Sequence, residues 1–224
     1  MAFDWNDVAV RKALGMRTDF ARDELAYAGV STDSRTVSEG DLYVALVGDR
    51  FDGHDFVADA FAKGAAGAVV SKPSAGDPAG TFYPVDDTLD ALGRLAAWRR
   101  NKIDGPVVAI TGSSGKTTTK EMTRAALSET YRVHATSGNL NNRIGMPLTI
   151  LSMPDDVEAV VLELGTNEPG EIEALVKVAR PNIAVVTTVG ESHLEKLESF
   201  DGVLTEKLDI LRGMADGGRC VVGD

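Results

Sequence analysis

Apolar runs and amphipathic helical patterns alternate along the second half of the chain. The apolar runs predict strands at 107–110, 158–164, 182–188 and 219–223. The spacing of apolar residues predicts helices from 120 to about 129, at 171–179 and at 200–214. Strands that are apolar throughout and separated by helices are typical of a parallel sheet covered on both faces. The second half is therefore expected to form such a sheet.

Shorter elements fill the first half. The predicted elements are strands at 41–47 and 67–71, helices at 54–63 and 88–100, and a surface loop at 74–80. In the first of these helices, Phe56, Val57, Ala60 and Phe61 would share one face. The run Asp104-Gly105-Pro106 interrupts the pattern, and we expect a domain boundary there.

One glycine-rich turn between a predicted strand and a predicted helix has the character of a phosphate-binding loop. Its residues are Thr111, Gly112, Ser113, Ser114, Gly115, Lys116, Thr117 and Thr118. Glycines let main-chain N–H groups approach phosphate oxygens, and the helix N-terminus adds positive potential. Lys116 would bridge the terminal phosphates of a nucleotide, and the Thr117 hydroxyl would hold Mg²⁺. The turn is shorter than the common pattern, with Ile110 where that pattern has glycine, so an ordinary turn is the alternative.

The fold class predicted from these patterns is α/β, in two domains. A small N-terminal α/β domain at residues 1–104 would precede a mostly parallel-sheet domain of the phosphate-loop type at 105–224. The series of strands and helices stops at Asp224, directly after a predicted strand. We therefore expect this chain to be the N-terminal part of a longer protein.

Composition narrows the classes of function. The chain has 34 acidic against 23 basic residues, a net charge of −11, which is unfavourable for nucleic-acid binding. Cys220 is the single cysteine, which excludes an internal disulfide and a cysteine-based zinc site, and its apolar neighbours predict a small core residue. The sequence has neither an apolar signal core at its start nor a stretch long enough to insert in a membrane. A cytoplasmic protein fits these features.

Two polar residues stand at the ends of predicted strands, where open α/β sheets bind ligands. Glu163 follows a run of Val and Leu, and it is either a solvated strand end or a ligand of Mg²⁺ beside the phosphate loop. His193 lies just past the strand at 182–188. It is either an ordinary loop histidine or a member of a magnesium or manganese shell.

Lys207 falls on the apolar face of the predicted helix at 200–214. That face comprises Phe200, Val203, Leu204, Leu208 and Leu211. One interpretation is a lysine whose stem is buried while its amine reaches solvent. The other is an amine whose pKa is lowered by desolvation, so that its neutral form is chemically available.

Two polar loops are candidate binding segments. The run from Asn139 to Pro147 is rich in amides, and it is either a cluster of turns or a set of donors, Asn139 and Asn142 among them, for a phosphorylated or sugar ligand. In the first half, Ser34 and Arg35 lie in a similar polar run, where Arg35 would meet either phosphate or a surface carboxylate.

Taken together, these segments resemble the Mur ligase family of peptidoglycan synthesis. The motifs that carry the resemblance lie at 32–35, 51–56, 111–118, 138–142, 144–147, 163–165, 170–172 and 193–195. The resemblance implies that the short phosphate loop is the form this family uses. It also implies that Glu163 and His193 bind magnesium, and that Lys207 is carbamylated by CO₂ and binds a second metal ion.

The resemblance further implies an ATP-dependent ligase that forms an amide through an acyl phosphate. Its cofactors would be ATP and up to two Mg²⁺ ions, the latter held by Thr117, Glu163, His193 and the carbamate of Lys207. The run Gly138-Asn139-Leu140-Asn141-Asn142 favours UDP-N-acetylmuramoyl-tripeptide and D-Ala-D-Ala as substrates. The UDP end would lie near Ser34 and Arg35. The enzyme is expected to be a cytoplasmic monomer with neither nucleic acid nor membrane as a partner.

Other functions remain open on the sequence alone. The chain could be a nucleotide-binding or UDP-sugar-binding module without catalysis, or part of another Mur or folylpolyglutamate-type ligase. In this family a further domain delivers the amine substrate, and that domain is expected outside these 224 residues. The chain by itself is therefore expected to fold but not to ligate.

Overall fold

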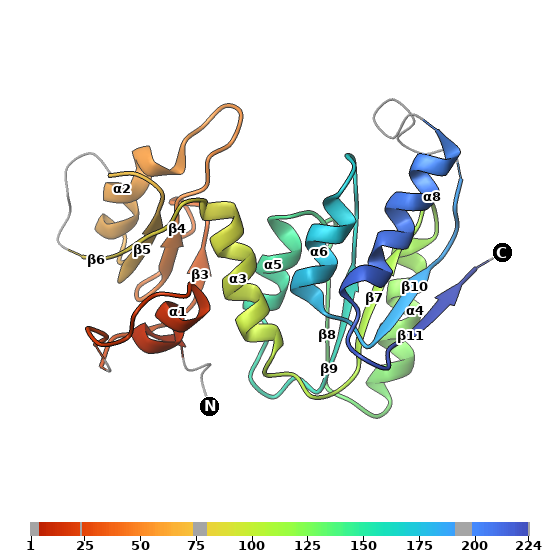
Figure 1. Ribbon diagram of the computed structural model, residues 1–224. Helices are drawn as coiled ribbons and strands as arrows, with labels where there is room; N and C mark the ends of the chain where they lie inside the picture. Colours follow the sequence, from red (N-terminus) through yellow and green to blue (C-terminus); the bar gives the residue numbers. More distant parts are fainter. Residues whose placement is uncertain (1–4, 23, 74–79, 191–198, 224) are drawn as a thin grey trace. The chain divides into compact units, whose positions relative to one another are not determined.

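A computed structural model describes residues 5–22, 24–73, 80–190 and 199–223. The chain divides into two compact units, Met1–Leu95 and Ala96–Asp224 (Figure 1). Each unit contains a parallel sheet with helices, and the predicted α/β class is confirmed. None of the helices in these described ranges has the length and hydropathy needed to cross a bilayer.

The second unit is built on a five-stranded sheet. Its strands are β7 (Val107–Thr111), β8 (Val133–Ala135), β9 (Ala159–Glu163), β10 (Ile183–Val186) and β11 (Arg219–Val222). They lie in the order β11-β10-β7-β9-β8, and every neighbouring pair is parallel. Every residue of β7 and β9 is buried, as expected for central strands covered on both faces.

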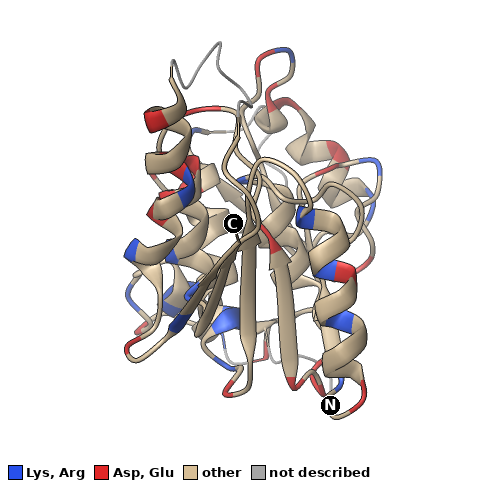
Figure 2. Cartoon of the chain, turned by 90° about the vertical axis from the view of Figure 1, so that its right-hand side faces the viewer, with Lys and Arg blue, Asp and Glu red and all other residues tan. Residues whose placement is uncertain are grey.

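Helices lie on either side of these strands (Figure 2). They are α4 (Lys116–Ser128), α5 (Gly145–Leu151), α6 (Glu171–Ala179), α8 (Phe200–Leu208) and the 3₁₀ helix η2 (Asp209–Gly213). From β7 the chain passes through α4 toward β8 at one edge, whereas from β10 it passes through α8 toward β11 at the other. Adjacent strands whose connections leave in opposite directions open a crevice at their carboxyl ends, which is where such sheets bind ligands. The turn after β7 lies at this point.

The first unit is smaller and has two sheets. Strands β3 (Val30–Ser31), β4 (Leu42–Val44), β5 (Gly67–Val70) and β6 (Thr81–Pro84) form a parallel sheet, and β1 (Trp5–Asn6) pairs with β2 (Ala26–Tyr27) in antiparallel fashion. Its helical segments are α1 (Asp7–Ala13), η1 (Gly53–Phe56) and α2 (Val57–Ala62). Val57 and Ala60 of α2 pack with Tyr43 and Ala68 in one core cluster.

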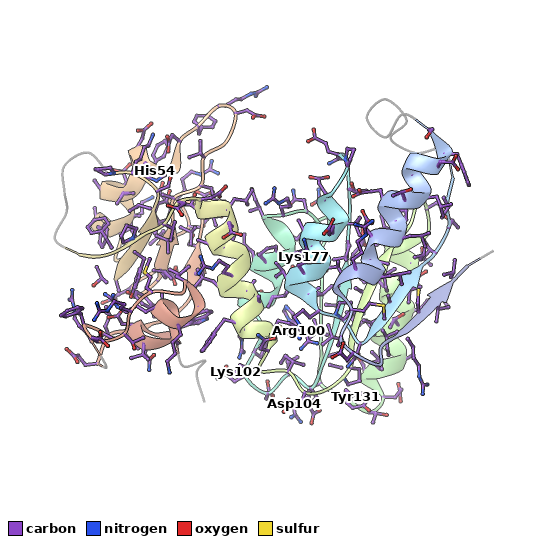
Figure 3. The ribbon with its side chains drawn as sticks, in the orientation of Figure 1. His54, Arg100, Lys102, Asp104, Tyr131 and Lys177 are labelled. Atoms are coloured by element: carbon purple, nitrogen blue, oxygen red, sulfur yellow. The ribbon has the colours of Figure 1, made fainter. Side chains whose placement is uncertain are left out.

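Helix α3 (Thr88–Arg100) contains the division between the units. Its last two residues are buried arginines that bond within the second unit. Arg99 donates to the carbonyls of Met153 and Pro154, and Arg100 donates to those of Ala179 and Arg180 at the end of α6 (Figure 3). These bonds fix the last turn of α3 in the second unit, so the division lies earlier in the chain than the expected boundary at 104/105.

Several elements follow the hydrophobic pattern, and others depart from it. Helices α3 and α6 have the predicted bounds, whereas the predicted helix at 54–63 begins as η1 and the one at 200–214 changes to η2 after Leu208. The amide-rich run ends in a helix that was not predicted, α5, whose Pro147 lies in the first turn, where a missing N–H costs no helical bond. The predicted loop at 74–80 lies almost wholly outside the described residues.

Two predictions of buried residues are wrong. Phe200 and Leu211, assigned to the inward face with Lys207, are exposed. Leu211 lies in η2, where the 3₁₀ turn shifts the helical phase after α8 ends at Leu208, and Phe200 is the first residue of α8. Cys220 is exposed rather than part of the core, because β11 is an edge strand with all four residues exposed.

A buried hydrogen-bond network holds β2, β6 and α1 together. The Tyr83 hydroxyl donates to Asp7 Oδ1 at 2.6 Å and lies 2.7 Å from the Tyr27 hydroxyl. Burial alone would raise the pKa of Asp7, but the bonds from Tyr83, the Arg22 main chain and Arg11 lower it below its ordinary value. Burial raises the pKa of Tyr27 to about 12. Asp7 is therefore a buried anion whose desolvation is offset by these donors.

Replacing Tyr83 by phenylalanine is expected to destabilise the protein. The substitution removes one hydroxyl and leaves two buried polar groups, on Asp7 and Tyr27, short of a partner. Such a loss costs about 1–3 kcal/mol. Urea denaturation followed by circular dichroism would measure the change in the free energy of unfolding.

The matched control for this prediction is Tyr131→Phe, which removes the hydroxyl of an exposed tyrosine. It should leave the free energy of unfolding within about 0.5 kcal/mol of the original. Equal losses in the two variants would show that the Tyr83 hydroxyl has no special role.

Candidate functional site

The turn between β7 and α4 requires glycine at its first position. Gly112 has a φ of +147°, and a Cβ atom there would lie 2.0 Å from Thr187 Oγ1. A side chain at this position would therefore strain the backbone and collide with the segment that follows β10. This close approach brings the turn against the segment that follows β10.

Residues after β10 support the turn through several hydrogen bonds. The Ser113 N–H donates to the Thr188 carbonyl at 2.9 Å, and the Ser114 N–H donates to Thr188 Oγ1 at 3.0 Å. The Thr187 hydroxyl donates to the Ser114 carbonyl at 2.6 Å. Sequence reasoning did not assign this role to the two threonines, because their partners lie more than seventy residues away.

Lys116 opens helix α4 and lies against the turn. Its Nζ donates to the Gly112 carbonyl at 2.7 Å, and its side chain is half-buried. The first turn of α4 has no acidic residue, so the positive end of the helix is not neutralised by its own side chains. The amine and the helix terminus are placed as an anion site requires.

Glu163 ends β9 and is buried, with 3% of its surface exposed, so it is not a solvated strand end. Its Oε2 accepts a hydrogen bond from the Thr117 hydroxyl at 3.0 Å, and its Oε1 accepts one from Asn141 Nδ2 at 2.9 Å. The structure thus brings Glu163 and Thr117 together, as the sequence led us to expect. Carboxylate and hydroxyl oxygens are the ligand types that Mg²⁺ prefers, so this pair fits the implied metal.

Asn141 is a site residue that sequence reasoning missed. Besides holding Glu163, it approaches Gly165 so closely that a Cβ there would lie 2.8 Å from the Asn141 side chain. The Gly165 N–H also donates to the Asn141 carbonyl at 2.8 Å. The signal in the sequence was the amide-rich run itself, which did not distinguish among its asparagines.

The two asparagines selected from that run are placed differently. Asn142 Oδ1 accepts from the N–H groups of Ile144 and Gly145 at the start of α5, which agrees with the turn-cluster interpretation for this residue. Asn139 is exposed. A role of either residue in binding substrate stays a prediction.

Lys207 points inward as predicted and is fully buried, with 1% of its surface exposed. The pKa of its amine is lowered to about 8, chiefly by burial and further by the charge of Lys116, while Glu206 and Glu171 act in the opposite direction. With its pKa lowered in this way, the amine of Lys207 loses its proton more readily than that of an exposed lysine, and the neutral form is the nucleophilic one.

Glu206, next to Lys207, is a second residue that the sequence did not reveal. Its buried carboxylate accepts from the Thr166 hydroxyl at 3.0 Å and from the N–H groups of Gly170 and Ile172 at 2.6 and 2.9 Å. These bonds tie α8 to the N-terminus of α6 and to the loop after Glu163. Glu206 therefore fixes the position of the helix that carries Lys207.

His193, the remaining predicted metal ligand, lies outside the described residues. Within the described parts of the chain, no group of three or more His, Cys, Asp or Glu side chains is arranged to hold a metal ion. Of the predicted metal ligands, Thr117 and Glu163 are the two whose oxygens the described residues bring together beside the phosphate loop.

The predicted residues of the first unit, Ser34 and Arg35, lie in the loop after β3. Arg35 is exposed and bonds both carboxylate oxygens of Asp33, and this holds the pKa of Asp33 down at about 2. Ser34 is buried, and its carbonyl accepts from Lys63 Nζ at 2.8 Å. Arg35 thus meets a surface carboxylate here, and contact with a phosphate stays a prediction.

Comparison with known proteins identifies relatives of the chain. The model of the Mur ligase middle domain matches residues 110–224, and the model described as Mur ligase family, catalytic domain, matches residues 26–100. A UDP-N-acetylmuramoyl-tripeptide–D-alanyl-D-alanine ligase of Bacillus subtilis (strain 168) is 44% identical over 198 residues. That alignment covers 88% of this chain and 43% of the relative, so the chain spans less than half of its length.

Solved structures agree with this result. The crystal structure of MurF from Acinetobacter baumannii has a TM-score of 0.91 and 36% identity, over 99% of this chain and 49% of that one. MurF ligase from Thermotoga maritima, solved in complex with ADP, has a TM-score of 0.82 and 35% identity, over 90% of this chain and 46% of that one. With one family model covering more than half of its residues, the chain belongs to the Mur ligase family.

Proposed function

We propose that this chain provides the ATP-binding and UDP-substrate-binding parts of a ligase that joins D-Ala-D-Ala to UDP-N-acetylmuramoyl-tripeptide. The observation that carries the proposal is the arrangement of Lys116, Thr117 and Glu163 around a glycine turn at the switch point of the sheet. The names of relatives at 36–44% identity support the choice of substrates. The similar structure solved with ADP supports the nucleotide.

In this proposal the turn binds the phosphates of ATP. The binding residues would be Thr111, Gly112, Ser113, Ser114, Gly115, Lys116, Thr117 and Thr118. The Lys116 amine would leave the Gly112 carbonyl for a phosphate oxygen, an exchange that favours the charged acceptor. Its charge would stabilise the negative charge that develops on the transferred phosphoryl group.

The chemistry proposed is amide formation through an acyl phosphate. A carboxylate oxygen of the tripeptide bonds to the γ-phosphorus as the bond to the bridging oxygen of ADP breaks. The amine of D-Ala-D-Ala then bonds to the acyl carbon, phosphate leaves, and the amine loses a proton. Lys116 and the N-terminus of α4 would hold the phosphoryl oxygens in place through both steps.

Thr117 and Glu163 would hold Mg²⁺, together with His193 and a carbamate on Lys207. The ion would supply positive charge against the phosphate oxygens. Burial of Lys207 on the inward face supports the carbamate. In its formation the ammonium group first loses a proton, and the neutral amine then bonds to the carbon of CO₂ and releases a second proton. A buried cation thereby becomes an anionic oxygen donor.

The first unit, Met1–Leu95, would bind the UDP end of the substrate near Ser34 and Arg35. Asn139 and Asn142 of the second unit would contact the sugar-peptide part. We propose that the protein acts as a monomer in the cytoplasm, in keeping with its acidic charge and its class of substrate.

Lys116→Ala is expected to weaken binding of Mg-ATP roughly tenfold to a hundredfold, because a hydrogen bond to a charged group contributes about 1.5–3 kcal/mol. The change removes a half-buried side chain from the mouth of the turn and no core volume, so the fold should persist. Isothermal titration calorimetry would give the dissociation constants, and circular dichroism would verify folding.

Lys177→Ala is the control for that measurement, since Lys177 is an exposed lysine of the same unit, on α6 (Figure 3). Its affinity for Mg-ATP should equal that of the unmutated protein. Equal affinities in the Lys116 and Lys177 variants would refute the phosphate-loop assignment.

UDP and ADP are expected to perturb different parts of the whole chain. In ¹⁵N-labelled protein, UDP should shift main-chain amide resonances near Ser34 and Arg35, because the proposed uridine site lies in that loop. ADP with Mg²⁺ should shift those of residues 111–118. Each nucleotide serves as the control for the other. UDP shifts confined to 105–224 would contradict the proposed uridine site in the first unit.

A further inference from the structure

Lys120 is a fully buried lysine to which the proposed function assigns no role. It lies one turn after Lys116 in α4, and 2% of its surface is exposed. Burying an ammonium group is costly unless the group is paired and hydrogen-bonded. Its partners therefore indicate what this position contributes.

Two groups accept from the Lys120 amine. Nζ lies 2.8 Å from the Thr136 carbonyl oxygen and 3.1 Å from Glu121 Oε1. The Glu121 side chain is about half exposed, and ion pairs of that kind contribute little. The buried bond to Thr136 is thus the one that compensates for the desolvated amine.

Thr136 is itself buried and attached to β9. Its N–H donates to the Val161 carbonyl at 3.0 Å, and its hydroxyl oxygen accepts from the Glu163 N–H at 3.0 Å. Lys120 therefore bonds to Thr136, the residue after β8 whose hydroxyl is bonded to the main chain of Glu163.

The segment 136–142, named here the asparagine loop, meets Glu163 at both ends. It begins at Thr136, which holds the Glu163 main chain, and it reaches Asn141, which holds Glu163 Oε1. Residues 137–140 between them are exposed. The placement of Asn141 thus depends on the anchors at both ends of the loop, which at Asn141 include the bond from the Gly165 N–H to its carbonyl.

We infer that Lys120 is a positioning residue for Glu163. By tying the start of the asparagine loop to α4, it places Asn141 to hold Glu163 Oε1 while Thr117 of the same helix meets Oε2. One helix therefore orients both oxygens of the carboxylate, one directly and one through the loop. The inference rests on the proposed function in that this carboxylate is taken to hold Mg²⁺ beside the nucleotide.

Lys120→Met tests the inference, because methionine has a similar length and suits a buried position. The first readout is exchange of the Asn141 side-chain amide hydrogens with solvent, measured by NMR. The second is the ratio of ADP affinities with and without Mg²⁺, measured by calorimetry. We expect faster exchange in the variant, and a ratio lower by about tenfold, the size of one charge-assisted hydrogen bond. ADP affinity without Mg²⁺ should be unchanged, because Lys116 and the turn are untouched.

Glu121→Gln is the matched control, since it removes the exposed partner of Lys120 and keeps the bond to Thr136. It should leave both readouts at their original values. A merely structural role of Lys120 would lower stability without changing the ratio, and that result would overturn the inference. So would an equal loss of ADP affinity with and without Mg²⁺.

The two readouts separate this inference from the proposed function. If Mg²⁺ has no effect on the ADP affinity of the unmutated chain, the metal role of Glu163 is refuted. The exchange of the Asn141 amide hydrogens then tests the positioning role alone, and unchanged exchange in Lys120→Met would refute that role as well. Lys120→Gln, which keeps an N–H donor without the charge, serves if the methionine variant does not fold. An unaltered ratio and unaltered exchange in that variant would equally overturn the inference.

Discussion

The buried carboxylate of Glu163 is the constraint around which the second unit is arranged. A carboxylate at the end of a central, fully covered strand loses its hydration, and that loss must be compensated by donors held in place. Thr117 supplies one donor from the helix that begins at the phosphate turn, and Asn141 supplies the other from the asparagine loop. Satisfying this one anion therefore fixes the relative positions of β9, α4 and the loop between β8 and α5.

The same physical requirement recurs at other buried charges of the unit. Glu206 accepts hydrogen bonds from N–H groups at the start of α6, and Arg100 donates hydrogen bonds to carbonyl groups at its end. Such groups at helix termini have no partners inside the helix. A buried charge of opposite sign to the helix end bonds to them, so the desolvation of the charge and the missing bonds of the helix end are offset together. Helix α6 is thus held at both ends, and it packs against α8, which carries Lys207.

The hydrophobic pattern predicted the central strands and the long helices, because burial on one or both faces leaves a periodic record in the sequence. It did not predict β1, β2, β3, β6 or β8, which have two to four residues each and are too short to show a period. The residues of the candidate site likewise fall into those that the sequence predicted and those that it did not. Glu163 and Lys207 stood out as charges among apolar residues, whereas Asn141 and Glu206 depend on partners 22 and 34–40 residues away, which no local pattern records.

The charges around the phosphate turn also bear on the proposed carbamate. The positive charge of Lys116 contributes to lowering the pKa of Lys207, after the larger effect of burial. Phosphate oxygens bound at Lys116 would offset that charge. A carbamate on Lys207 would act differently, by turning a repulsive pair into an attractive one and providing an anionic oxygen for a metal ion. In the proposed function, nucleotide, metal and carbamate would therefore each compensate for the positive charge of Lys116 and for the desolvation of the buried Lys207 amine.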